Sequence, residues 1–497
     1  MTQFVIRDYQ EKDLAAIRAA LRKSNSALYC LATGGGKTVT AGFMVDAAAK
    51  KEKIVWFVTH RKEIADQTAK TFQKMGMRFG VIMTKTNCRP MSNIQIGMVQ
   101  TIARRLDNLV PPDLIVFDEA HHTAANQWQA IYDAYPKAFK VGLSATPARL
   151  DGKGLNDFFA SLVMGKDTNQ LISEGHLSPY KMFAPAVLDT SKLHIRAGDF
   201  KKEELEELIG SNAIIGDVVN TYIKLAMGKK GILFAPTVKT SEKFVAAFNE
   251  AGIKAVHVDG KTPKAERDKI TDEYKNGDWD IMSNVGLFGE GYDVPDTEVV
   301  IDASPTMSLV NVKQRWGRAL RPVYNPDMPA GTEAERHAAI AAGKKPYAII
   351  IDNAGNCFRH GLPCDEIEWS LEPRKKGTPK LTDDSGGMKQ CPKCWSAVKQ
   401  HIKTCDNSLP NGSTCGHVWV VVSQSRDEVE GNLEEVTKEQ VDEMKKAEAK
   451  KKKMEQGQAE TLEELIKLGT ERGYKNPKSW AAYIFKGRQA KAARNGS

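Results

Sequence analysis

The stretch ALYCLATGGGKTVT (residues 27–40) runs from apolar residues through three glycines to Lys37 and Thr38. A strand, a glycine-rich turn and the start of a helix follow one another in this way in phosphate-binding loops. Glycines let backbone N–H groups approach phosphate oxygens, the lysine reaches the β- and γ-phosphates, and the threonine hydroxyl binds Mg²⁺. The stretch therefore predicts an α/β fold with a site for a nucleoside triphosphate and Mg²⁺.

This loop differs from the common pattern GxxxxGK[ST], because Leu31 stands where the first glycine is usual. Ala32, Thr33 and Gly34 then carry the start of the loop. A glycine-rich turn that binds no nucleotide is the alternative interpretation. The residues expected to contact the nucleotide here are Thr33, Gly34, Gly35, Gly36, Lys37 and Thr38.

Two acidic residues, Asp118 and Glu119, follow the apolar run LIVF at residues 114–117. A buried parallel strand places its last residues at the edge of the sheet where ligands bind, so both carboxylates should lie beside the phosphates. Asp118 can then hold Mg²⁺, while Glu119 orients and deprotonates the attacking water. A lone acidic pair would mean little, but this pair follows both an apolar strand and a phosphate loop.

Short apolar or β-branched runs alternate with helix-like stretches, such as residues 62–75, in both halves of the chain. This alternation is typical of parallel sheets covered by helices. Two α/β domains in tandem are therefore predicted. The runs lie at residues 27–31, 54–58, 94–99, 114–117 and 141–143 in the first half and at 231–234, 255–258, 280–283, 299–301 and 347–351 in the second.

The length of 497 residues suits two large domains with appendages. Hydrophobic residues make up 41% and charged residues 27%, which argues against global disorder. The net charge of +9 suits polyanions without requiring them. No run approaches the ~18–20 apolar residues that span a bilayer, and the start MTQFVIRDYQ carries charge where a secretory signal is apolar. We expect no membrane contact and a location in the bacterial cytoplasm, or in the host cytoplasm if a phage encodes the chain.

The pairing of GGGKT (residues 34–38) with DEAH (residues 118–121) is similar to the superfamily-two helicases and translocases. Further motifs of that family follow in the family's order, so the resemblance extends from residue 6 to residue 351. It implies two RecA-like domains that bind and hydrolyse ATP. Residues 7–10 (RDYQ) look like the adenine-reading element, which assigns Arg7 and Gln10 to nucleotide binding.

The resemblance also covers two elements that connect the nucleotide with the rest of the protein. Residues 144–147 (SATP) match the element that couples hydrolysis to strand movement, and the histidine of DEAH would link the carboxylates to it. Residues 284–293 (NVGLFGEGYD) resemble an element in which a glycine and an aspartate approach the nucleotide. The residues implicated are His121, Ser144 and Thr146 in coupling, and Gly291 and Asp293 at the nucleotide.

Residues 314–321 (QRWGRALR) fit the QRxGRxxR pattern of the same family, which places Gln314 in the catalytic site. Arg318 and Arg321 are three apart, so they project from one face of a helix. Guanidinium groups are suited to spreading phosphoryl charge, which makes both residues candidate arginine fingers, and exposed helix charges are the alternative. Because the lysine and carboxylates belong to one domain and the arginines to the other, the ATP site should be complete only when the domains close.

Polar residues that follow several predicted strands are candidates for gripping the backbone of a nucleic-acid strand, as the resemblance implies. Backbone contacts give affinity but little sequence information, so binding should be nonspecific and salt-sensitive. Each residue could instead cap a helix or form a turn. The candidates are Thr59, Arg61, Gln100, Thr101, Thr237 and Ser283.

Half of the eight cysteines fall in one short stretch, where two thiolates on a knuckle turn are followed by two more after a hairpin-sized gap. Four such thiolates can bind Zn²⁺ tetrahedrally, with free or redox-active thiols as the alternative. The last two cysteines are separated by nine residues, which leaves open that His401 or His417 replaces one of them. The candidate ligands are Cys391, Cys394, Cys405 and Cys415, while Cys30, Cys88, Cys357 and Cys364 are expected to be buried or incidental.

The predicted fold is α/β, with two tandem RecA-like parallel-sheet domains, a C-terminal zinc ribbon and a short helical tail. The linker is rich in proline, glycine and charge, and the spacer is dominated by lysine and glutamate. The predicted limits are 1–180 for the first domain, 181–212 for a connector, 213–371 for the second domain, 372–387 for a linker, 388–424 for the zinc ribbon, 425–459 for a charged helical or disordered spacer and 460–497 for the helical tail module.

A helicase core followed by a linker, a zinc ribbon and a helical tail resembles the bacterial RadD-type DNA repair helicases more than the DEAH RNA helicases. This resemblance implies an ATP-dependent DNA helicase or translocase that acts in replication, recombination or repair, with ATP, Mg²⁺ and Zn²⁺ as cofactors. DNA is favoured over RNA as the partner, and a single-stranded-DNA-binding or other repair protein is a further candidate partner. The alternatives are an RNA-dependent ATPase and a nucleic-acid-binding adaptor in which ATP acts as a switch.

Overall fold

The computed structural model divides the chain into two units, Met1–Val420 and Val421–Ser497. Of the predicted segments, most of the linker and of the charged spacer lies outside the described residues. The structure describes residues 4–82, 92–122, 126–147, 154–184, 190, 193–196, 198–287, 297–373, 387–409, 413–419, 459, 461–471, 477–478, 481–482 and 484–485.

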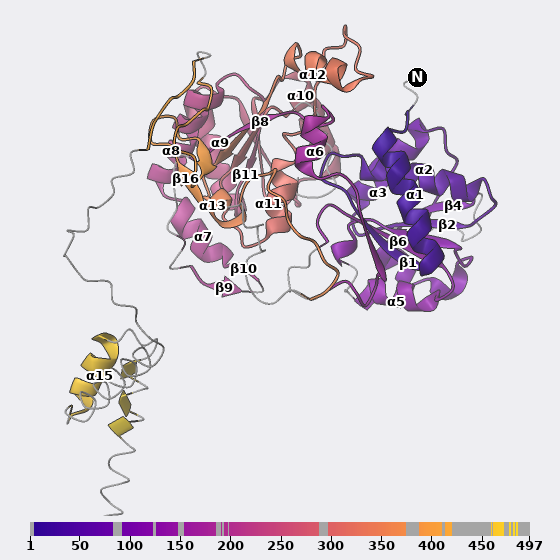
Figure 1. Ribbon diagram of the computed structural model, residues 1–497, viewed down its shortest axis with the longest axis horizontal. Helices are drawn as coiled ribbons and strands as arrows, with labels where there is room; N and C mark the ends of the chain where they lie inside the picture. Colours follow the sequence, from indigo (N-terminus) through magenta and orange to yellow (C-terminus); the bar gives the residue numbers. More distant parts are fainter. Residues whose placement is uncertain are drawn as a thin grey trace, which may run out of the picture. The chain divides into compact units, whose positions relative to one another are not determined.

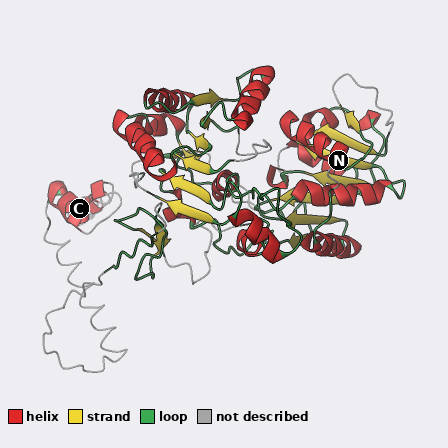
Figure 2. Ribbon diagram, turned by 90° about the horizontal axis from the view of Figure 1, so that it is seen from above, coloured by secondary structure: helices red, strands yellow, loops and turns green. Residues whose placement is uncertain are grey.

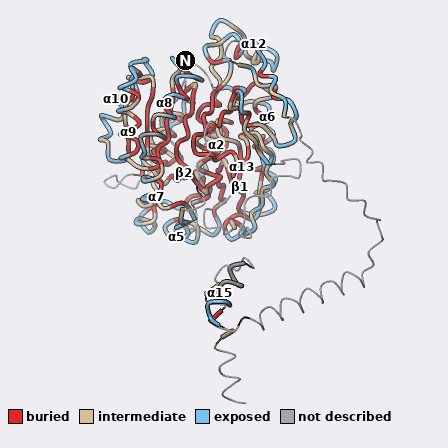
Figure 3. The backbone as a smooth tube through the Cα atoms, turned by 90° about the vertical axis from the view of Figure 1, so that its left-hand side faces the viewer, coloured by how far each residue is buried: buried red, intermediate tan, exposed pale blue. Residues whose placement is uncertain are grey.

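The first domain is built on a seven-stranded sheet in which all neighbouring strands are parallel (Figure 1). Its central strands are buried on both faces, as their continuous apolar sequence requires. Figure 3 shows the buried backbone in red inside a more exposed outer layer. In pairing order the strands are β3 (Gly80–Ile82), β4 (Ile94–Met98), β2 (Val55–Thr59), β5 (Leu114–Phe117), β6 (Phe139–Ser144), β1 (Ser26–Cys30) and β7 (Ser161–Met164).

Helices cover both faces of this sheet. Alternate strand residues point to opposite faces, so Phe57 joins the hydrophobic cluster of one helix layer while Trp56 joins the cluster of the other. The layer on the Phe57 side consists of α1 (Asp8–Lys23), α2 (Lys37–Ala49) and α3 (Lys62–Lys74), and the layer on the Trp56 side of α4 (Val99–Ala103) and α5 (Asn126–Ala134).

The second domain repeats this architecture with a six-stranded parallel sheet between helix layers (Figure 2). In pairing order its strands are β12 (Ala255–Val258), β13 (Ile281–Asn284), β11 (Gly231–Phe234), β14 (Val299–Asp302), β15 (Ala348–Asp352) and β8 (Tyr180–Phe183). One face packs on α7 (Lys202–Ile209), α8 (Asn212–Ala226) and α9 (Val238–Glu250), and the other on α10 (Lys264–Asn276) and α11 (Leu309–Trp316).

Shorter elements complete the part of this unit that the structure describes. They are the 3-10 turns Leu106–Asn108 and Ala120–His122, α6 (Thr168–Ser173), the hairpin β9 (Ile195–Arg196) and β10 (Asp199–Phe200), α12 (Glu333–Ala341) and α13 (Asn356–His360).

The two parallel sheets confirm the predicted pair of RecA-like domains. One boundary differs, because β8 belongs to the second sheet although the prediction divides it between the first domain and the connector. β8 pairs with β15, far along the chain, and local sequence carries no sign of such a pairing.

The cysteine-containing segment forms an antiparallel hairpin of β16 (Met388–Gln390) and β17 (Ala397–Lys399). Isolated bridges join Thr404 to Val418 and Ser408 to Thr414.

In the second unit, α15 (Leu462–Glu471) begins in the predicted helical tail. Thr461 and Glu464 cap its first turn reciprocally, each side chain accepting a hydrogen bond from the other's backbone N–H at 3.2 Å. Among the described residues, no helix has the length and apolar character needed to cross a membrane.

Candidate active site

The phosphate-binding loop connects β1 to α2 in a conformation that only glycine adopts easily. Gly34 and Gly36 have positive φ angles of 87° and 91°, and Gly36 directly precedes the first residue of α2, Lys37. A methyl group on Gly36 would lie 2.8 Å from Gln10 Nε2. The backbone of the loop is therefore exposed toward the position of a phosphate, with the N-terminus of α2 behind it.

The N-terminus of α1 braces this loop. The Tyr9 hydroxyl donates to the Gly35 carbonyl at 2.7 Å, and Gln10 Nε2 donates to the Gly36 carbonyl at 3.5 Å. The Arg7 backbone N–H donates to Gln10 Oε1 at 3.0 Å, so both ends of the Gln10 amide contact the protein. Arg7 and Gln10 thus lie beside the loop, while their contact with an adenine base stays a prediction.

The two carboxylates of DEAH lie at the end of β5. Asp118 is buried, and its Oδ1 accepts the Glu119 backbone N–H at 3.0 Å. Glu119 has a left-handed φ of 48°, an uncommon strain for a non-glycine residue that is found most often at functional sites. Its Oε1 lies 3.8 Å from Lys37 Nζ, so the predicted lysine and base lie in contact distance.

His121 lies between Glu119 and the SATP element. Its Nδ1 is 3.4 Å from Glu119 Oε2 and 3.4 Å from the Ser144 hydroxyl. That hydroxyl in turn donates to the Thr146 carbonyl at 2.7 Å. A continuous path of polar contacts therefore joins the Glu119 carboxylate to the end of β6, while a role of this path in coupling stays a prediction.

The second domain supplies α11, which is anchored through the buried Asp302 at the end of β14. Arg315 Nη1 donates to Asp302 Oδ1 at 3.0 Å, and Trp316 Nε1 donates to Oδ2 at 3.1 Å. Asn356 also donates to Oδ2 at 3.1 Å. Because these contacts use the residues between Gln314 and Arg318, they fix the direction in which the flanking side chains of the motif project.

Residues from both domains line one cleft of about 1090 Å³. The Gln314 amide is buried there, and neither its oxygen nor its nitrogen has a hydrogen-bond partner among the residues that the structure describes. Burial lowers the pKa of the Arg321 guanidinium, a desolvation cost that a phosphate anion would offset. The predicted site residues that line the cleft are Thr33, Gly34, Gly36, Lys37, Thr38, Asp118, Glu119, Gln314, Arg318 and Arg321.

The domains meet closely at the loop. A methyl group on Gly317 would lie 2.6 Å from Thr33 Cγ2, and one on Gly34 would lie 3.8 Å from Arg321 Cγ. The Thr38 hydroxyl and the Asp118 carboxylate border the same cleft and form an oxygen donor set of the kind that Mg²⁺ prefers. Mg²⁺ held there would neutralise phosphate charge. The arrangement can therefore hold a triphosphate, present a base to water and place guanidinium groups opposite the lysine.

Comparison with known proteins agrees with this geometry. Residues 3–149 match the protein family described as "Type III restriction enzyme, res subunit", and residues 213–323 match "Helicase conserved C-terminal domain". A 51.5 kDa protein of a Lactococcus phage (isolate 7-9) is 35% identical over 413 residues, which cover 82% of each chain. The chain belongs to the superfamily 2 helicases. It is accordingly a nucleic-acid-dependent ATP hydrolase.

Two further proteins are similar to this chain, one in sequence and one in fold. IRC3 of Saccharomyces cerevisiae, whose name assigns it provisionally to the ATP-dependent helicases, is 29% identical over 346 residues. The match covers 65% of this chain and 50% of IRC3, so the chain spans about half the length of that relative. A fragment from Vibrio vulnificus YJ016, provisionally an HsdR subunit of a type I restriction enzyme, shares the fold with a TM-score of 0.55 and 20% identity over 73% of this chain and 68% of the fragment.

The residues predicted to contact nucleic acid are mostly engaged within the helicase domains. Thr59 is fully buried and its hydroxyl donates to the Arg61 carbonyl at 3.2 Å. Ser283 is also fully buried, with its hydroxyl 2.6 Å from that of Ser241. Thr237 caps α9, which was the alternative interpretation of this residue. Thr59 and Ser283 could contact a strand only after a change in local structure, whereas Thr237 is half-buried and its contact with nucleic acid stays a prediction.

The other nucleic-acid candidates are half-buried, like Thr237. Gln100 Nε2 donates to the His60 carbonyl at 3.5 Å, and Thr101 is half-buried. Arg61 Nη1 donates across the domain boundary to the Gly286 carbonyl at 3.4 Å. Their contacts with nucleic acid stay predictions. The predicted nucleotide contacts Gly291 and Asp293 lie outside the described residues.

Sequence reasoning missed two ion pairs that join the domains at the rim of the cleft. Lys264 Nζ of α10 lies 2.6 Å from Asp66 Oδ2 of α3, and Arg267 Nη2 lies 3.0 Å from Glu63 Oε1. Each helix carries its two charges three residues apart, so both pairs form between one face of α3 and one face of α10. That complementary spacing was the only signal in the sequence, and it is common on solvated helices.

The four cysteines of the ribbon form a buried cluster. Their sulfur atoms all lie within 4.8 Å of one another. Cys391 and Cys415 are 3.7 Å apart, and Cys394 and Cys405 are 3.6 Å apart. Tetrahedral zinc with ~2.3 Å bonds to sulfur requires ~3.8 Å between sulfur atoms, so the cluster fits the metal. Neither His401 nor His417 joins the cluster in the part of the chain that the structure describes.

Proposed function

We propose that this protein is an ATP-dependent DNA helicase or translocase that couples ATP hydrolysis to movement on, or remodelling of, DNA in replication, recombination or repair. The observation that carries the proposal is the cleft that both domains line, with Lys37, Asp118 and Glu119 on one side and Arg318 and Arg321 on the other. A site divided in this way is complete only while the domains are together, so each turnover can drive a relative motion of the domains.

The predicted site residues that line the cleft each have a proposed role in hydrolysis. Lys37 contacts the β- and γ-phosphates, and Asp118 and the Thr38 hydroxyl would hold Mg²⁺, which would neutralise phosphate charge. Glu119 takes a proton from water. His121 contacts both Glu119 and Ser144, so it can transmit the change in charge of Glu119 to the SATP element. Arg318 and Arg321 stabilise the charge of the departing phosphoryl group, and the Gln314 amide binds the same group.

DNA is favoured over RNA as the track by two observations. The first domain matches a family named for restriction enzymes, whose substrate is DNA. The order of helicase core, zinc ribbon and helical tail also resembles the RadD-type DNA repair helicases. We propose that Cys391, Cys394, Cys405 and Cys415 hold one structural Zn²⁺, because four buried thiolates leave no open position for a substrate.

The decisive experiment measures ATP turnover side by side with single-stranded DNA, duplex DNA, branched DNA and RNA. Glu119→Gln, which keeps the shape of the site but lacks the base, sets the background. We expect DNA to stimulate turnover much more than RNA does. Stronger stimulation by RNA would overturn the proposal in favour of an RNA-dependent ATPase.

A second assay separates motion from switching. Displacement of an annealed strand, and of streptavidin from a biotinylated DNA end, is measured with ATP and with a nonhydrolysable analogue. A helicase displaces the strand and a translocase displaces streptavidin, each only with ATP. If the analogue supports as much protein recruitment as ATP, and neither displacement occurs, the protein is a nucleic-acid-binding adaptor.

A further inference from the structure

The zinc ribbon is attached to the edge of the second sheet. Ser396 forms an antiparallel bridge with Phe183 of β8, and the Ala184 backbone N–H donates to the Trp395 carbonyl at 3.0 Å. Lys224 of α8 lies over the Trp395 ring, 3.6 Å from its centroid. Backbone pairing and a covered aromatic ring make the ribbon a fixed extension of the second domain.

A segment that follows α13 connects this ribbon with α11. The Lys399 ammonium of the ribbon lies 2.6 Å from Asp365 Oδ1, and these side chains are only 20% and 9% exposed. Asp365 Oδ2 accepts the Leu362 backbone N–H at 2.8 Å. Salt screens so sheltered an ion pair less than a surface pair, and removal of one partner would leave the other charge poorly solvated.

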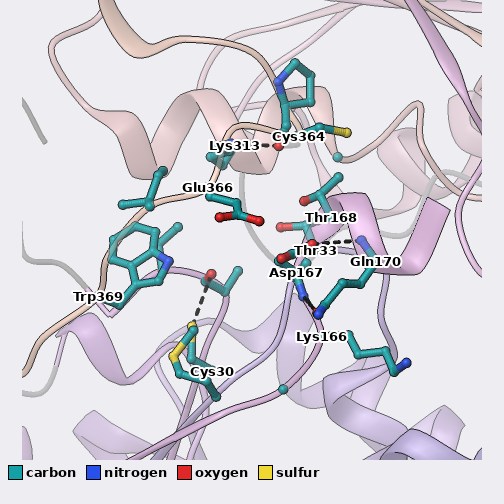
Figure 4. Close-up of a pocket in the computed structure, with 18 of the residues that line it drawn as sticks. Cys30, Thr33, Lys166, Asp167, Thr168, Gln170, Lys313, Cys364, Glu366 and Trp369 are labelled. Atoms are coloured by element: carbon teal, nitrogen blue, oxygen red, sulfur yellow. Dashed lines mark hydrogen bonds between the residues drawn. The ribbon is translucent and has the colours of Figure 1, made fainter. Parts of the chain in front are cut away.

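The same segment is held from its other side by Lys313, a residue of α11. The Lys313 ammonium donates to the carbonyls of Leu362 at 3.0 Å and Pro363 at 2.7 Å. Burial lowers the pKa of Lys313 to about 8, and the nearby Asp365 carboxylate opposes this shift. Figure 4 shows Lys313 at one side of a pocket whose opposite side is lined by Cys30.

Lys313 immediately precedes the residues that complete the ATP site. Gln314 is the next residue of the helix, and Gly317 packs so closely on Thr33 that an added methyl group would lie 2.6 Å away. Because the packed interior is not continuously deformable, a shift of the Lys313 anchor would move Gln314, Arg318 and Arg321 relative to the phosphate-binding loop.

The segment continues onto the first domain. The Leu371 carbonyl accepts the backbone N–H groups of Leu155 at 2.7 Å and Asn156 at 3.1 Å, and the Leu371 side chain packs on the apolar core beneath the first sheet. Asn156 Nδ2 also donates to Glu372 Oε2 at 3.0 Å. Residues 362–373 therefore contact the ribbon, α11 and the first domain in turn, and α11 leads directly into the turn that carries Arg318 and Arg321, which the sequence had placed on a helix.

We infer that the zinc ribbon positions α11 for ATP hydrolysis through Lys399, Asp365 and Lys313, so that an intact ribbon is required for full turnover. This inference deepens the proposed function, since it assumes that Gln314, Arg318 and Arg321 act on the nucleotide. Lys399, Asp365 and Lys313 are positioning residues, because they act through α11 and lie outside the ATP cleft.

The test is Lys399→Ala in the full-length, zinc-loaded protein, with ATP turnover measured against ATP concentration. We expect kcat to fall on the order of tenfold, the scale of couplings between sites, with much less change in the KM for ATP. Lys399→Arg should restore kcat, because the guanidinium can also reach Asp365. Lys403→Ala, which removes an exposed lysine of the same ribbon, is the matched control and should leave kcat unchanged.

Asp365→Asn removes the negative charge from the same ion pair without altering the ribbon, so it protects the test against a misfolded Lys399→Ala. Zinc content and thermal unfolding are measured for every variant. Wild-type kcat in both Lys399→Ala and Asp365→Asn, with zinc retained, would overturn the inference. The result is read as the ratio of variant to wild type on whichever polynucleotide stimulates turnover. A wild-type enzyme stimulated by RNA alone would therefore contradict the proposed function and leave the coupling measurable.

Discussion

The ATP cleft and the zinc ribbon are assembled in opposite ways. The cleft is lined by Lys37 and Arg321, which lie far apart in sequence and belong to different domains. The ribbon draws its four ligands from Cys391 to Cys415, and its sulfur atoms converge within 4.8 Å. A site built between domains can open and close during a reaction cycle, whereas a site built within a short segment stays closed as long as its metal is bound.

We therefore expect the cleft to change shape during the reaction cycle and the ribbon to keep one structure. The strained Glu119 backbone, the Gln314 amide, which has no hydrogen-bond partner among the described residues, and the contact of Gly317 with Thr33 all lie where the domains meet. The ribbon instead pairs with β8 through backbone hydrogen bonds and buries its ligands. Substitutions in the two regions should therefore differ in what they remove.

The largest effect is expected from Lys37→Ala, which removes the ammonium that contacts the β- and γ-phosphates. ATP turnover should be abolished while the fold is kept, because Lys37 lies in the cleft and its ion-pair distance to Glu119 is a loose 3.8 Å. Turnover and thermal unfolding are measured together. Substantial residual turnover in a folded variant would remove the loop from the active site.

Glu119→Gln is the matched contrast to Lys37→Ala within the same cleft. It keeps the shape of the side chain and leaves Mg²⁺ binding to Asp118, so ATP should bind and hardly hydrolyse. Binding is followed with a fluorescent ATP analogue. Loss of binding in Glu119→Gln would contradict the separate roles of the two carboxylates.

Arg321→Ala tests the half of the cleft that comes from the second domain. Turnover should fall by ~10³-fold, the scale of an arginine finger, with ATP binding much less affected. Arg318 lies in the same cleft, so the double variant should lose less than the product of the two single effects. A change of less than tenfold in Arg321→Ala would move this residue out of the catalytic site.

Gly317→Ala tests whether the closed contact itself matters. The added methyl group would lie 2.6 Å from Thr33 Cγ2, so α11 must move away from the phosphate-binding loop. Such a misplacement should lower turnover by roughly 10²-fold. Gly216→Ala is the control, since a methyl group at this helical position meets nothing within 4 Å. Equal turnover in the two variants would show that the closed contact is not needed for hydrolysis.

The sequence predicted the central strands well and the edge strands poorly. In the two parallel sheets, every apolar run proposed as a strand coincides with a described strand and the edge strand β12 was found, but β3, β7 and β8 were missed. All three lie at sheet edges, and β3 and β7 are only partly buried. A central strand of a parallel sheet is covered on both faces and reads as a continuous apolar run, whereas an edge strand has exposed positions that break this signal.

The site was predictable to the extent that its chemistry is local. The glycines and Lys37 of the loop, the DEAH carboxylates and the four cysteines each form a compact pattern in the sequence. Burial of Thr59 and Ser283 and the contact between Lys399 and Asp365 depend on tertiary packing, which leaves no periodic trace. The Gly317 contact with Thr33 could not be found either, because it joins residues from different domains.

Cys391→Ser tests the ribbon side of the comparison. The wild-type protein should contain one equivalent of zinc, and the variant should lose it, because a hydroxyl is a far poorer zinc ligand than a thiolate. If the ribbon positions α11, turnover should fall on the order of tenfold, much less than in the cleft variants. Cys357 is buried but lies outside the cluster, so the Cys357→Ser variant should retain the zinc of the ribbon. Metal analysis that finds no zinc in the wild type would remove the site.

The smallest effect is expected at the ion pairs that bridge the domains. Like the cleft, they join residues far apart in sequence, but they lie partly in solvent. Lys264 and Asp66 are 52% and 34% exposed, so their 2.6 Å contact should contribute little. Lys264→Asp alone should lower turnover at most about five-fold at low salt, and the combination with Asp66→Lys should restore it.

The bridging role is separated from a general charge effect by a matched ion pair within one domain. Asp46 of α2 and Lys50, the C-cap residue of this helix, are 2.7 Å apart, with exposures of 32% and 75%, and both belong to the first domain. Lys50→Asp should therefore leave turnover unchanged. The effect of Lys264→Asp should also disappear near 0.5 M salt, where the screening length falls to about 4–5 Å. A loss that persists in high salt, or that Asp66→Lys does not reverse, would mean that Lys264 acts within α10 and not across the domains.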